Sequence, residues 1–481
     1  MADYLAVDLG AGSGRVILGR FTSSGLRLDE LHRFEMPHRH IEGHERWDFA
    51  QMLAEIETGL RAAHGECDSI LSVGVDGWGV DFGLLDENGD LLGDPVCYRD
   101  SRTDGVMDEL RRRMPASEIY QRTGIQFMPF NTGVQLLAQV TGAEWPEDAH
   151  RLLMVPDLVH RHLSGQARSE FTNATTTQLL NAGSREWDEK LLAVIGVPHE
   201  VMPPLIQAGE RIGALTAELC EATGFEKLDV VAPATHDTGS AVAGTPLEDG
   251  WAYISSGTWS LLGVETASPV VSELALEHNF TNEGGAFGVN RLLRNVMGLW
   301  LLESCRLRWQ DVSHDDLLHG LESHVPGDVF LDPDDLRFLH PVDMVEEIRA
   351  FLEETGQCIP TEPSAVARVI LESLALRYAQ VVDQIEEVTG VAVQGVHIVG
   401  GGSQNTFLDQ ATANATGRPV RAGPVEATAI GNLLVQAIAD GVFPNLASAR
   451  RFVGRTTAPE EFIPREADAW TKARERFARL G

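Results

Sequence analysis

The segment from residue 6 to residue 21, AVDLGAGSGRVILGRF, constrains the fold more than any other part of the chain. An apolar run that contains Asp8 leads into a cluster of glycines, and strand-forming residues follow directly from Val16. A dinucleotide-binding fingerprint needs a third glycine three places after the second, followed by a helix, but Arg15 stands there. The pattern therefore predicts a strand, a glycine turn and a second strand, which argues against a Rossmann crossover.

The positions of the lysines exclude two other phosphate-binding designs. The lysines are Lys190, Lys227 and Lys472. None follows a glycine and precedes Ser or Thr, as the lysine of a P-loop does. None lies in a strand of the V-A-I-K type, which a protein kinase needs. With no lysine in these motifs, backbone N–H groups must hold any phosphate bound at the glycine turns.

A second hairpin of the same design, AYISSGTWSLLGVE at residues 252–265, follows half a chain later. Two matching units suggest two related lobes, although glycine hairpins are common and the match can be fortuitous. Strands and helices alternate elsewhere, which predicts an α/β protein divided into residues 1–244 and 245–481. We expect a strand meander with an Asn88-Gly89 turn over 69–93. We also expect strand–turn–helix units over 228–244 and 395–417, and a further helix over 423–441.

Composition limits which binding partners and which cellular compartment are expected. The formal net charge of −33 opposes binding to nucleic acid and to acidic membranes. No apolar run is long enough to span a bilayer, and no secretory signal is expected at the N-terminus. The five cysteines are scattered and form no C-x-x-C pair, so we expect no disulfide framework, no zinc site and a cytoplasmic location.

Several segments together resemble the FGGY carbohydrate kinases, and within that family the rhamnulokinase branch. The resemblance extends over nearly the whole chain. The segments that carry it are VDLGAGSGR, WGVDFGLLD, YRDSRT, QRTGIQFMPFNT, FTNATTTQLLN, HDTGSAV, SSGTWSL, NFTNEGG, NVMGLWLL, HIVGGGSQN and GPVEAT.

The resemblance implies a fold and an activity. The fold is two ribonuclease-H-like lobes of the actin and hexokinase ATPase superfamily, with an active-site cleft between them. The activity is transfer of the γ-phosphoryl group of MgATP to the 1-hydroxyl of L-rhamnulose, by a monomer or a homodimer. One alternative is the same chemistry on another ketose, such as L-fuculose or L-xylulose. Another, from a different class, is a non-catalytic or chaperone-like ATPase of the same superfamily.

The resemblance also implies which residues bind MgATP. Asp8 corresponds to the Mg²⁺ ligand, although the bare sequence is equally consistent with an aspartate that caps the turn. Glu303 stands where the family has a glutamine that contacts ATP, and a carboxylate suits that contact less well. The positions that correspond to the ATP-binding residues are Ala11, Gly12, Ser13, Gly14, Arg15, Thr258, Glu303 and Gly401.

Asp237 corresponds to the catalytic base that takes the proton from the sugar hydroxyl. Without the resemblance, the sequence predicts only a helix N-cap there. We expect the helix N-terminus to favour the ionised carboxylate, which is the form a base needs. The positions that correspond to sugar-binding residues are Gly79, His236, Asp237, Thr238 and Asn295.

Three further features need an interpretation. Gly77 replaces a threonine of the family beside the sugar site, which leaves the identity of the ketose open. Arg99, Asp100 and Arg102 either line the cleft or form a structural ion cluster. His38, His40 and His44 suggest a metal site, but their spacing fits no familiar motif, and we expect a solvated loop.

Overall fold

The computed structural model describes residues 2–67, 69–309, 312–318, 321 and 325–480. The chain packs into two compact units, and each unit is assembled from three separate segments. The first unit contains Met1–Pro246, Glu265–Leu292 and Ala427–Thr456, and the second contains Leu247–Val264, Leu293–Glu426 and Thr457–Gly481. The division of the chain at residue 245 stays a prediction.

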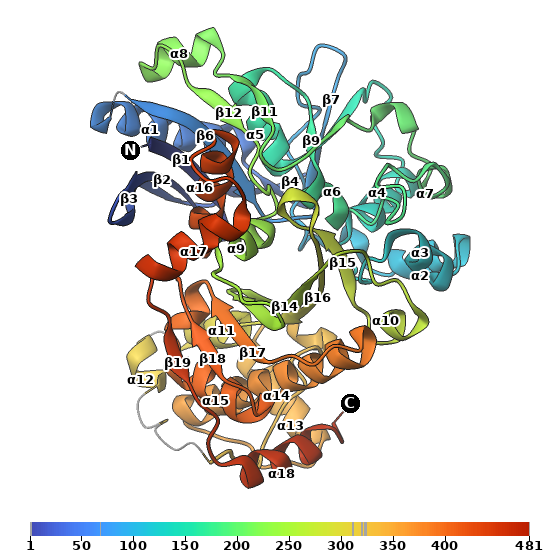
Figure 1. The fold of residues 1–481 in the computed structure, drawn as a ribbon. Helices are drawn as coiled ribbons and strands as arrows, with labels where there is room; N and C mark the ends of the chain where they lie inside the picture. Colours follow the sequence, from blue (N-terminus) through green and yellow to red (C-terminus); the bar gives the residue numbers. More distant parts are fainter. Residues whose placement is uncertain (1, 68, 310–311, 319–320, 322–324, 481) are drawn as a thin grey trace. The chain divides into compact units, whose positions relative to one another are not determined.

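The first unit is built on a six-stranded sheet with the order β11-β12-β6-β1-β2-β3 (Figure 1). The first three strands along the chain form an antiparallel meander, while β6 and β12 run parallel to β1. The strands are β1 (Ala2–Leu9), β2 (Ser13–Thr22), β3 (Gly25–Glu35), β6 (Ile70–Gly77), β11 (Arg211–Ala214) and β12 (Asp229–Val231).

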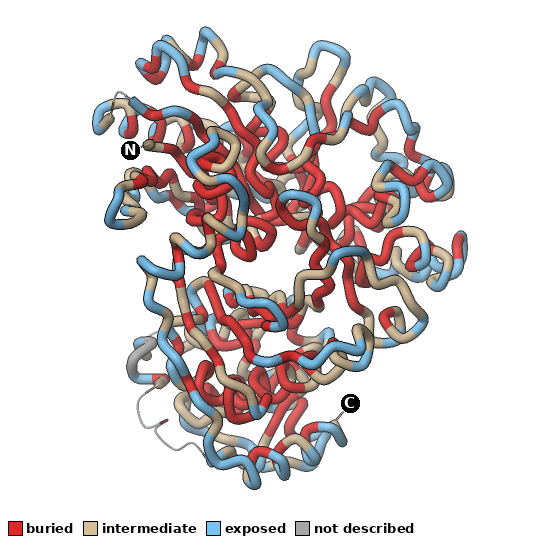
Figure 2. The backbone as a smooth tube through the Cα atoms, viewed as in Figure 1, coloured by how far each residue is buried: buried red, intermediate tan, exposed pale blue. Residues whose placement is uncertain are grey.

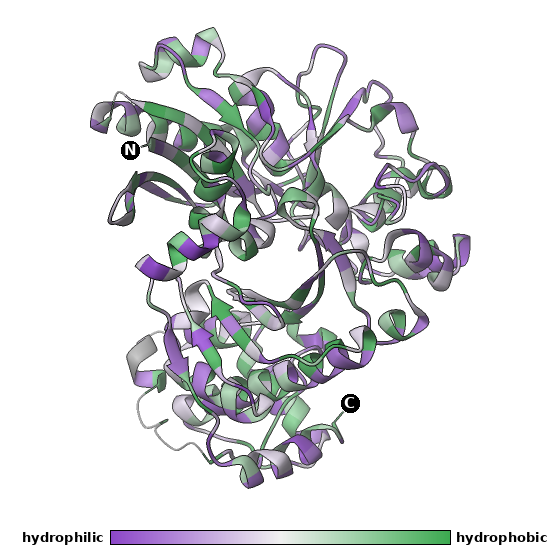
Figure 3. Ribbon diagram, in the orientation of Figure 1, coloured by the Kyte–Doolittle hydropathy of each residue, from purple (hydrophilic) through white to green (hydrophobic). Residues whose placement is uncertain are grey.

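Helices cover both faces of this sheet, because alternate residues of a strand point to opposite faces. Leu5 and Val7 of β1 pack with the apolar side of α1 (Phe49–Glu66). Tyr4 and Ala6, which alternate with them along the strand, pack with α16 (Ala427–Ala439). Residues 4–9 of β1 are buried, and Figures 2 and 3 show the central strands as buried and hydrophobic. Buried on both faces, these strands read as continuous apolar runs.

The rest of the first unit surrounds this layered core. Its remaining strands are β4 (His38–Ile41), β5 (His44–Trp47), β7 (Phe82–Leu85), β8 (Arg151–Met154), β9 (Ser169–Glu170), β10 (Leu205–Ile206) and β15 (Thr281–Gly284). Its remaining helices are α2 (Val106–Arg113), α3 (Ala116–Thr123), α4 (Thr132–Thr141), α5 (Val155–Ser164), α6 (Phe171–Thr176), α7 (Glu189–Ile195), α8 (Ala217–Thr223), α9 (Asp237–Gly244), α10 (Glu273–Glu277) and α17 (Leu446–Thr456).

The second unit repeats the strand plan of the first. The second sheet has seven strands in the order β15-β16-β14-β13-β17-β18-β19, in which β13 and β14 are antiparallel and β17 and β18 run parallel to β13. The last strand, β19, is antiparallel to β18, as β11 is to β12. The strands are β13 (Trp251–Ser256), β14 (Trp259–Thr266), β16 (Asn290–Met297), β17 (Gly395–Val399), β18 (Val420–Ala422) and β19 (Glu460–Phe462). The α/β class and the duplicated strand plan are confirmed.

The longest helix of the second unit, α14 (Pro363–Thr389), is buried along much of its length and ends at Gly390 in the left-handed conformation. Tyr378 Oη on α14 lies 2.6 Å from Ser260 Oγ on β14, which links the helix to the sheet. The C-terminal charged segment forms a docked helix with Trp470 buried. The other helices are α11 (Trp300–Arg308), α12 (His314–Leu318), α13 (Met344–Glu354), α15 (Thr406–Thr416) and α18 (Ala467–Phe477).

The predicted meander over 69–93 is correct in its turn and wrong in its pairing. Gly89 has a φ of 85°, as the predicted Asn88-Gly89 turn requires. However, β7 pairs with β8 in a separate two-stranded sheet, whereas β6 lies between β1 and β12. Among the residues that the structure describes, no helix is both long and apolar enough to cross a membrane.

Candidate active site

The turn between β1 and β2 is the first of the predicted phosphate-binding turns. Gly10 N donates to Ser13 O at 2.9 Å, which closes the turn around Ala11 and Gly12. A Cβ added at Gly12 would meet no atom within 4 Å, whereas one added at Gly14 would lie 2.2 Å from the Phe34 ring. Packing therefore explains the glycine at 14, and open space at Gly12 leaves the backbone accessible to a ligand.

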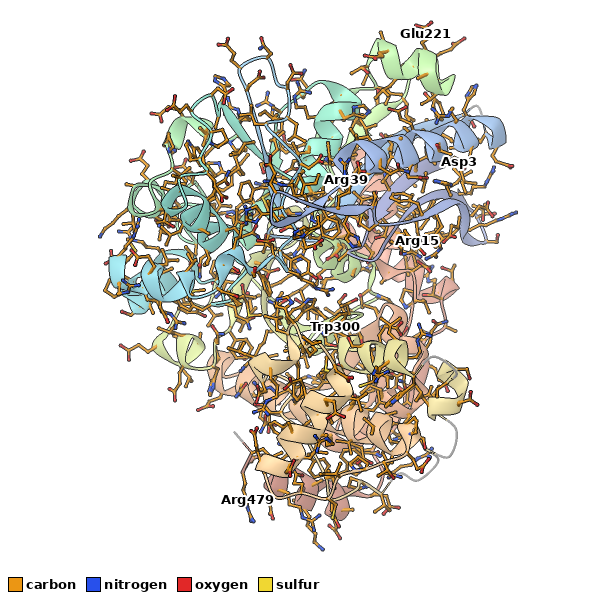
Figure 4. The ribbon with its side chains drawn as sticks, turned by 180° about the vertical axis from the view of Figure 1, so that it is seen from behind. Asp3, Arg15, Arg39, Glu221, Trp300 and Arg479 are labelled. Carbon is orange, nitrogen blue, oxygen red and sulfur yellow. The ribbon has the colours of Figure 1, made fainter. Side chains whose placement is uncertain are left out.

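Two carboxylates lie side by side where β1 and β6 end. Asp8 and Asp76 are register partners on these parallel strands. Asp8 forms an ion pair with Arg15 at the start of β2 (Figure 4 labels Arg15). Asp76 is fully buried, and its Oδ2 accepts from Asn432 Nδ2 at 2.5 Å. Burial, and then the charge of Asp8, raise the pKa of Asp76 well above its usual value.

The donor set at these strand ends fits a magnesium ion. Asp76 Oδ1 is buried without a hydrogen-bond partner in the part of the chain that the structure describes. A bound cation would satisfy that oxygen and relieve the repulsion between Asp76 and Asp8. Magnesium prefers carboxylate oxygens and keeps several waters, so one or two carboxylates suffice.

The loop after β6 lies against the start of α9. Gly77 N donates to Thr235 O at 2.9 Å, and Gly77 forms a parallel bridge with His236. Asn173 Nδ2 holds both sides of this junction, donating to Trp78 O at 3.4 Å and to Thr235 O at 3.3 Å. The structure thus places Gly79 on the loop that lies beside the segment His236–Asp237–Thr238.

The glycine at position 77 has a packing explanation. An added Cβ would lie 3.1 Å from Leu9 Cβ and 3.2 Å from Pro156 Cγ. A side chain at this position would point toward these two residues. Close packing therefore favours a glycine at position 77.

Asp237 is the first residue of α9, and His236 is the N-cap, so the N-cap predicted at Asp237 is wrong by one position. Asp237 Oδ1 accepts from Thr238 N at 2.5 Å and from Thr238 Oγ1 at 3.1 Å, and it lies 3.5 Å from His236 Nε2. Its other oxygen, Oδ2, accepts no hydrogen bond from the described residues. The side chain is 30% exposed, which leaves Oδ2 available to a substrate hydroxyl.

Two opposing effects act on the Asp237 carboxyl group. We expect the helix N-terminus to favour the ionised form. Burial acts the other way and raises the pKa of Asp237, although His236 and the donors of Thr238 oppose that shift. A raised pKa strengthens the carboxylate as a proton acceptor, provided that it is ionised at the working pH.

The buried carboxylate of Asp81 stabilises the loop that contains Gly79. Asp81 Oδ2 accepts from Trp47 Nε1 at 2.7 Å, from Trp78 Nε1 at 2.9 Å and from Tyr98 N at 3.1 Å. Gln135 Nε2 donates to Oδ1 at 3.2 Å. These donors fix the orientation of the Trp78 indole, which immediately precedes Gly79.

The Asp81 network predicts an unusual dependence of stability on pH. Burial raises the pKa of Asp81 to about 6, so Asp81 stabilises the fold fully below the unfolded-state pKa, and this contribution is lost as the pH rises through 6. Urea unfolding of the wild type and of Asp81→Asn should show the wild-type advantage falling by about 1.4 kcal/mol between pH 5 and pH 7.5. An advantage that is constant or rises over this range would contradict the assignment.

The second predicted phosphate-binding turn lies in the second unit. Thr258 stands between β13 and β14, and its carbonyl accepts from Gly298 N at 3.1 Å and from Trp300 N at 3.2 Å. Trp300 begins α11 (Figure 4). Glu303, in the first turn of that helix, forms an ion pair with Arg306. The arginine balances the charge of the Glu303 carboxylate.

The triple glycine after β17 has two different explanations. An added Cβ at Gly402 would lie 2.0 Å from Ser256 Oγ, and Gly400 has a φ of 81°, so packing and backbone conformation require both glycines. At Gly401, an added Cβ would meet nothing within 4 Å. Protein packing therefore does not require a glycine at 401.

The remaining candidates from the sequence are the cluster at residues 100–102, the histidines of residues 38–44 and Asn295. Asp100 accepts from His44 Nδ1 at 3.0 Å, and Arg102 donates to Gln135 Oε1 at 2.7 Å, which favours the structural ion cluster. His38 and His40 lie on the exposed strand β4, and among the described residues no three His, Cys, Asp or Glu side chains form a group that could hold a metal. Asn295 lies on β16, where its role stays a prediction.

Sequence reasoning missed three buried polar residues in the first unit. Asp76 is the next-to-last residue of β6 in the sequence GVDG, as Asp8 is of β1 in AVDL, and this repeated pattern could have identified it. Asn432 is 356 residues from its partner Asp76, and no local pattern indicates that contact. Glu170 accepts from Thr235 N at 2.9 Å and fixes the turn before His236, again through a long-range contact.

Comparison with known proteins identifies the family. Residues 3–244 match the N-terminal domain of the FGGY family of carbohydrate kinases, and residues 252–439 match its C-terminal domain. A rhamnulokinase of Bacteroides thetaiotaomicron is 42% identical over 473 residues, covering 98% of each chain. A rhamnulokinase of Bacillus subtilis is 39% identical, covering 97% of this chain and 96% of the relative.

Solved structures agree in fold. A ligand-bound xylulose kinase from Lactobacillus acidophilus aligns with a TM-score of 0.83 at 14% identity, covering 100% of this chain and 97% of that one. A Plasmodium falciparum glycerol kinase with ADP aligns with a TM-score of 0.78 at 16% identity, covering 99% and 98%. The duplicated strand plan, the two glycine turns and the matches over both halves lead to one conclusion: the chain belongs to the FGGY family of carbohydrate kinases.

Proposed function

We propose that this protein is an ATP-dependent L-rhamnulose kinase that forms L-rhamnulose 1-phosphate and ADP. The observation that carries the proposal is Asp237, whose Oδ1 takes every donor that the described residues supply while Oδ2 stays free on a partly exposed side chain. Near-full-length relatives that are rhamnulokinases support the choice of sugar. The unoccupied oxygen supports a base that acts on a substrate hydroxyl.

In the proposed reaction, Asp237 Oδ2 accepts the proton of the sugar 1-hydroxyl. The sugar oxygen forms a bond to the γ-phosphorus as the bond from that phosphorus to the β-γ bridging oxygen breaks, and ADP leaves with that electron pair. We assign sugar contacts to Gly79, His236, Thr238 and Asn295. Because the chain has no lysine in its glycine turns, backbone N–H groups position the phosphates.

We assign Mg²⁺ binding to Asp8, with Asp76 beside it. A magnesium ion bound there would neutralise charge that develops on the phosphates. Arg15 pairs with Asp8 and fixes its orientation. Asp76 Oδ1 is buried and has no hydrogen-bond partner among the described residues, which supports its assignment as an oxygen that faces the metal ion.

For the nucleotide we assign Ala11, Gly12, Ser13, Gly14 and Arg15 in the first unit, and Thr258, Glu303 and Gly401 in the second. The five cysteines are free thiols, which suits a reducing cytoplasm. The proposed reaction needs only two partners, the substrates ATP and a ketose. We propose that the protein acts as a monomer or a homodimer.

The glycines at 401 and 402 provide a matched pair of substitutions. Gly401→Val should raise the KM for ATP about tenfold or more with the melting temperature unchanged, because the added side chain occupies space that we assign to the adenosine. Gly402→Ala should instead lower the melting temperature, since its Cβ would lie 2.0 Å from Ser256 Oγ. Steady-state kinetics and thermal unfolding of both variants check this. An unchanged KM for ATP in Gly401→Val would remove the residue from the nucleotide site.

A ketose panel tests the substrate. L-rhamnulose, L-fuculose and L-xylulose would each be supplied with MgATP in a coupled assay for ADP. We expect the largest kcat/KM for L-rhamnulose. A larger value for either other ketose would keep the kinase and replace the sugar. ATP turnover that no ketose accelerates would instead favour the ATPase alternative.

A further inference from the structure

A chain of buried charged groups leads to Asp237 from the far side of His236. Glu283 on β15 is 4% exposed, and Arg291 on β16 is fully buried. Arg291 Nη2 donates to Glu283 Oε2 at 3.1 Å, and Arg291 Nε donates to Gly284 O at 2.8 Å. The arginine therefore fixes both the carboxylate of Glu283 and the backbone of the strand that carries it.

The Glu283 carboxylate and the Arg291 guanidinium both contact one nitrogen of His236. Glu283 Oε2 lies 3.1 Å and Arg291 Nη2 lies 3.2 Å from His236 Nδ1, and the imidazole is 8% exposed on its side chain. The other ring nitrogen, Nε2, lies 3.5 Å from Asp237 Oδ1. A histidine held at Nδ1 by a carboxylate has its ring orientation fixed at Nε2.

The charges of the group are arranged to keep Glu283 ionised. Burial alone would raise the pKa of Glu283, but His236 and Arg291 outweigh that effect and hold the pKa below its usual value. The groups that face Asp237 are then His236, Arg291 and, on β6, Asp76. An ionised carboxylate that is fixed in place restrains the imidazole beside it through the 3.1 Å contact at Nδ1.

We propose that Glu283, fixed by Arg291, is a positioning residue that orients His236 against Asp237 Oδ1, so that Asp237 presents Oδ2 to the acceptor hydroxyl. The role follows from geometry: Thr238 N and Thr238 Oγ1 donate to a single oxygen of Asp237, and His236 Nε2 lies 3.5 Å from the same oxygen. Thr238 belongs to the helix start, whereas the position of the His236 ring is set by Glu283. The inference rests on the proposed function of Asp237.

The decisive variant is Glu283→Gln, which keeps the size and removes the charge. We expect kcat for sugar phosphorylation to fall about 10- to 100-fold, with the KM for ATP changed by less than about twofold. The imidazole nitrogen NMR signals of His236 should move in this variant. Unchanged kcat, or a loss of activity that follows only the loss of folded protein, would overturn the inference.

Glu372→Gln is the matched control. Glu372 on α14 is 1% exposed, accepts from Arg368 Nε at 2.8 Å and from Gly327 N at 2.9 Å, and lies in the second unit. The substitution Glu372→Gln thus removes a carboxylate of similar burial that is also paired with an arginine. We expect kcat per folded molecule and the His236 signals to stay as in the wild type.

A charge-compensated double variant keeps the inference testable if Glu283→Gln fails to fold. Glu283→Gln combined with Arg291→Met removes both charges, so no buried charge is left uncompensated. The reduced kcat should persist, because His236 still lacks its ionised partner. Recovery of wild-type kcat would assign a purely structural role to the pair. Asp237→Asn separates the two proposals. If Asp237→Asn leaves phosphoryl transfer intact, the proposed function fails. If Asp237→Asn abolishes transfer but Glu283→Gln leaves kcat unchanged, only this inference fails.

Discussion

Replacing Asp237 with asparagine should lower kcat for sugar phosphorylation about a thousandfold, because asparagine cannot accept the proton of the attacking hydroxyl. The amide oxygen can still accept from Thr238 N and Thr238 Oγ1, so the start of α9 should keep its structure. The KM for ATP should change little, since Asp237 makes no proposed nucleotide contact. Steady-state kinetics with L-rhamnulose as the varied substrate would measure the effect.

Asp48→Asn is the control for this substitution. Asp48 is the N-cap of α1, and its side chain accepts from Gln51 N. Asparagine is an equally good N-cap, and the ion pair of Asp48 with the half-exposed Arg39 contributes little, so the variant makes the same chemical change at another helix start with little loss of stability. We expect it to retain wild-type kcat. If Asp237→Asn retained it too, Asp237 would not be the base.

Gly431→Ala should lower the free energy of unfolding by about 3 kcal/mol or more, because it forces two closely packed helices apart. A Cβ at Gly431 of α16 would lie 1.8 Å from Ser240 O of α9, and one at Gly244 would lie 2.1 Å from Ala427 O. Backbone lies against backbone here, so no side chain can move to make room. Urea unfolding measures the loss, and kcat should fall too, since α9 carries Asp237 at its start.

Gly65→Ala is the matched control, because Gly65 lies in α1 and its added Cβ would meet nothing within 4 Å. Alanine should leave the unfolding free energy unchanged or raise it by up to about 1 kcal/mol. Equal effects of the two substitutions would contradict the close approach of α9 and α16.

The sequence was sufficient wherever a short-range pattern dictated structure. The glycine turns at Gly12 and Gly257 joined apolar strands, and both hairpins formed as predicted. The segment around Asp237 combined an apolar strand with a helix start, and both elements are present. Periodicity and turn chemistry act over a few residues, so they can be read without the fold.

Long-range contacts were the part that sequence could not supply. The pairing of β7 with β8 depends on a strand that follows much later in the chain. Asn432 reaches Asp76 across 356 residues, and Glu283 reaches His236 from another segment of the first unit. The raised pKa of Asp237 also depends on burial by distant residues, which a local helix-terminus argument does not include.

The most direct test of the central claim is the product formed from L-rhamnulose and MgATP by the purified protein, identified by phosphorus and carbon NMR. We predict a phosphate ester on the 1-hydroxyl, with one ADP formed for each sugar consumed, and no such ester with Asp237→Asn. An ester on another hydroxyl, or ADP release without any sugar phosphate, would contradict the account.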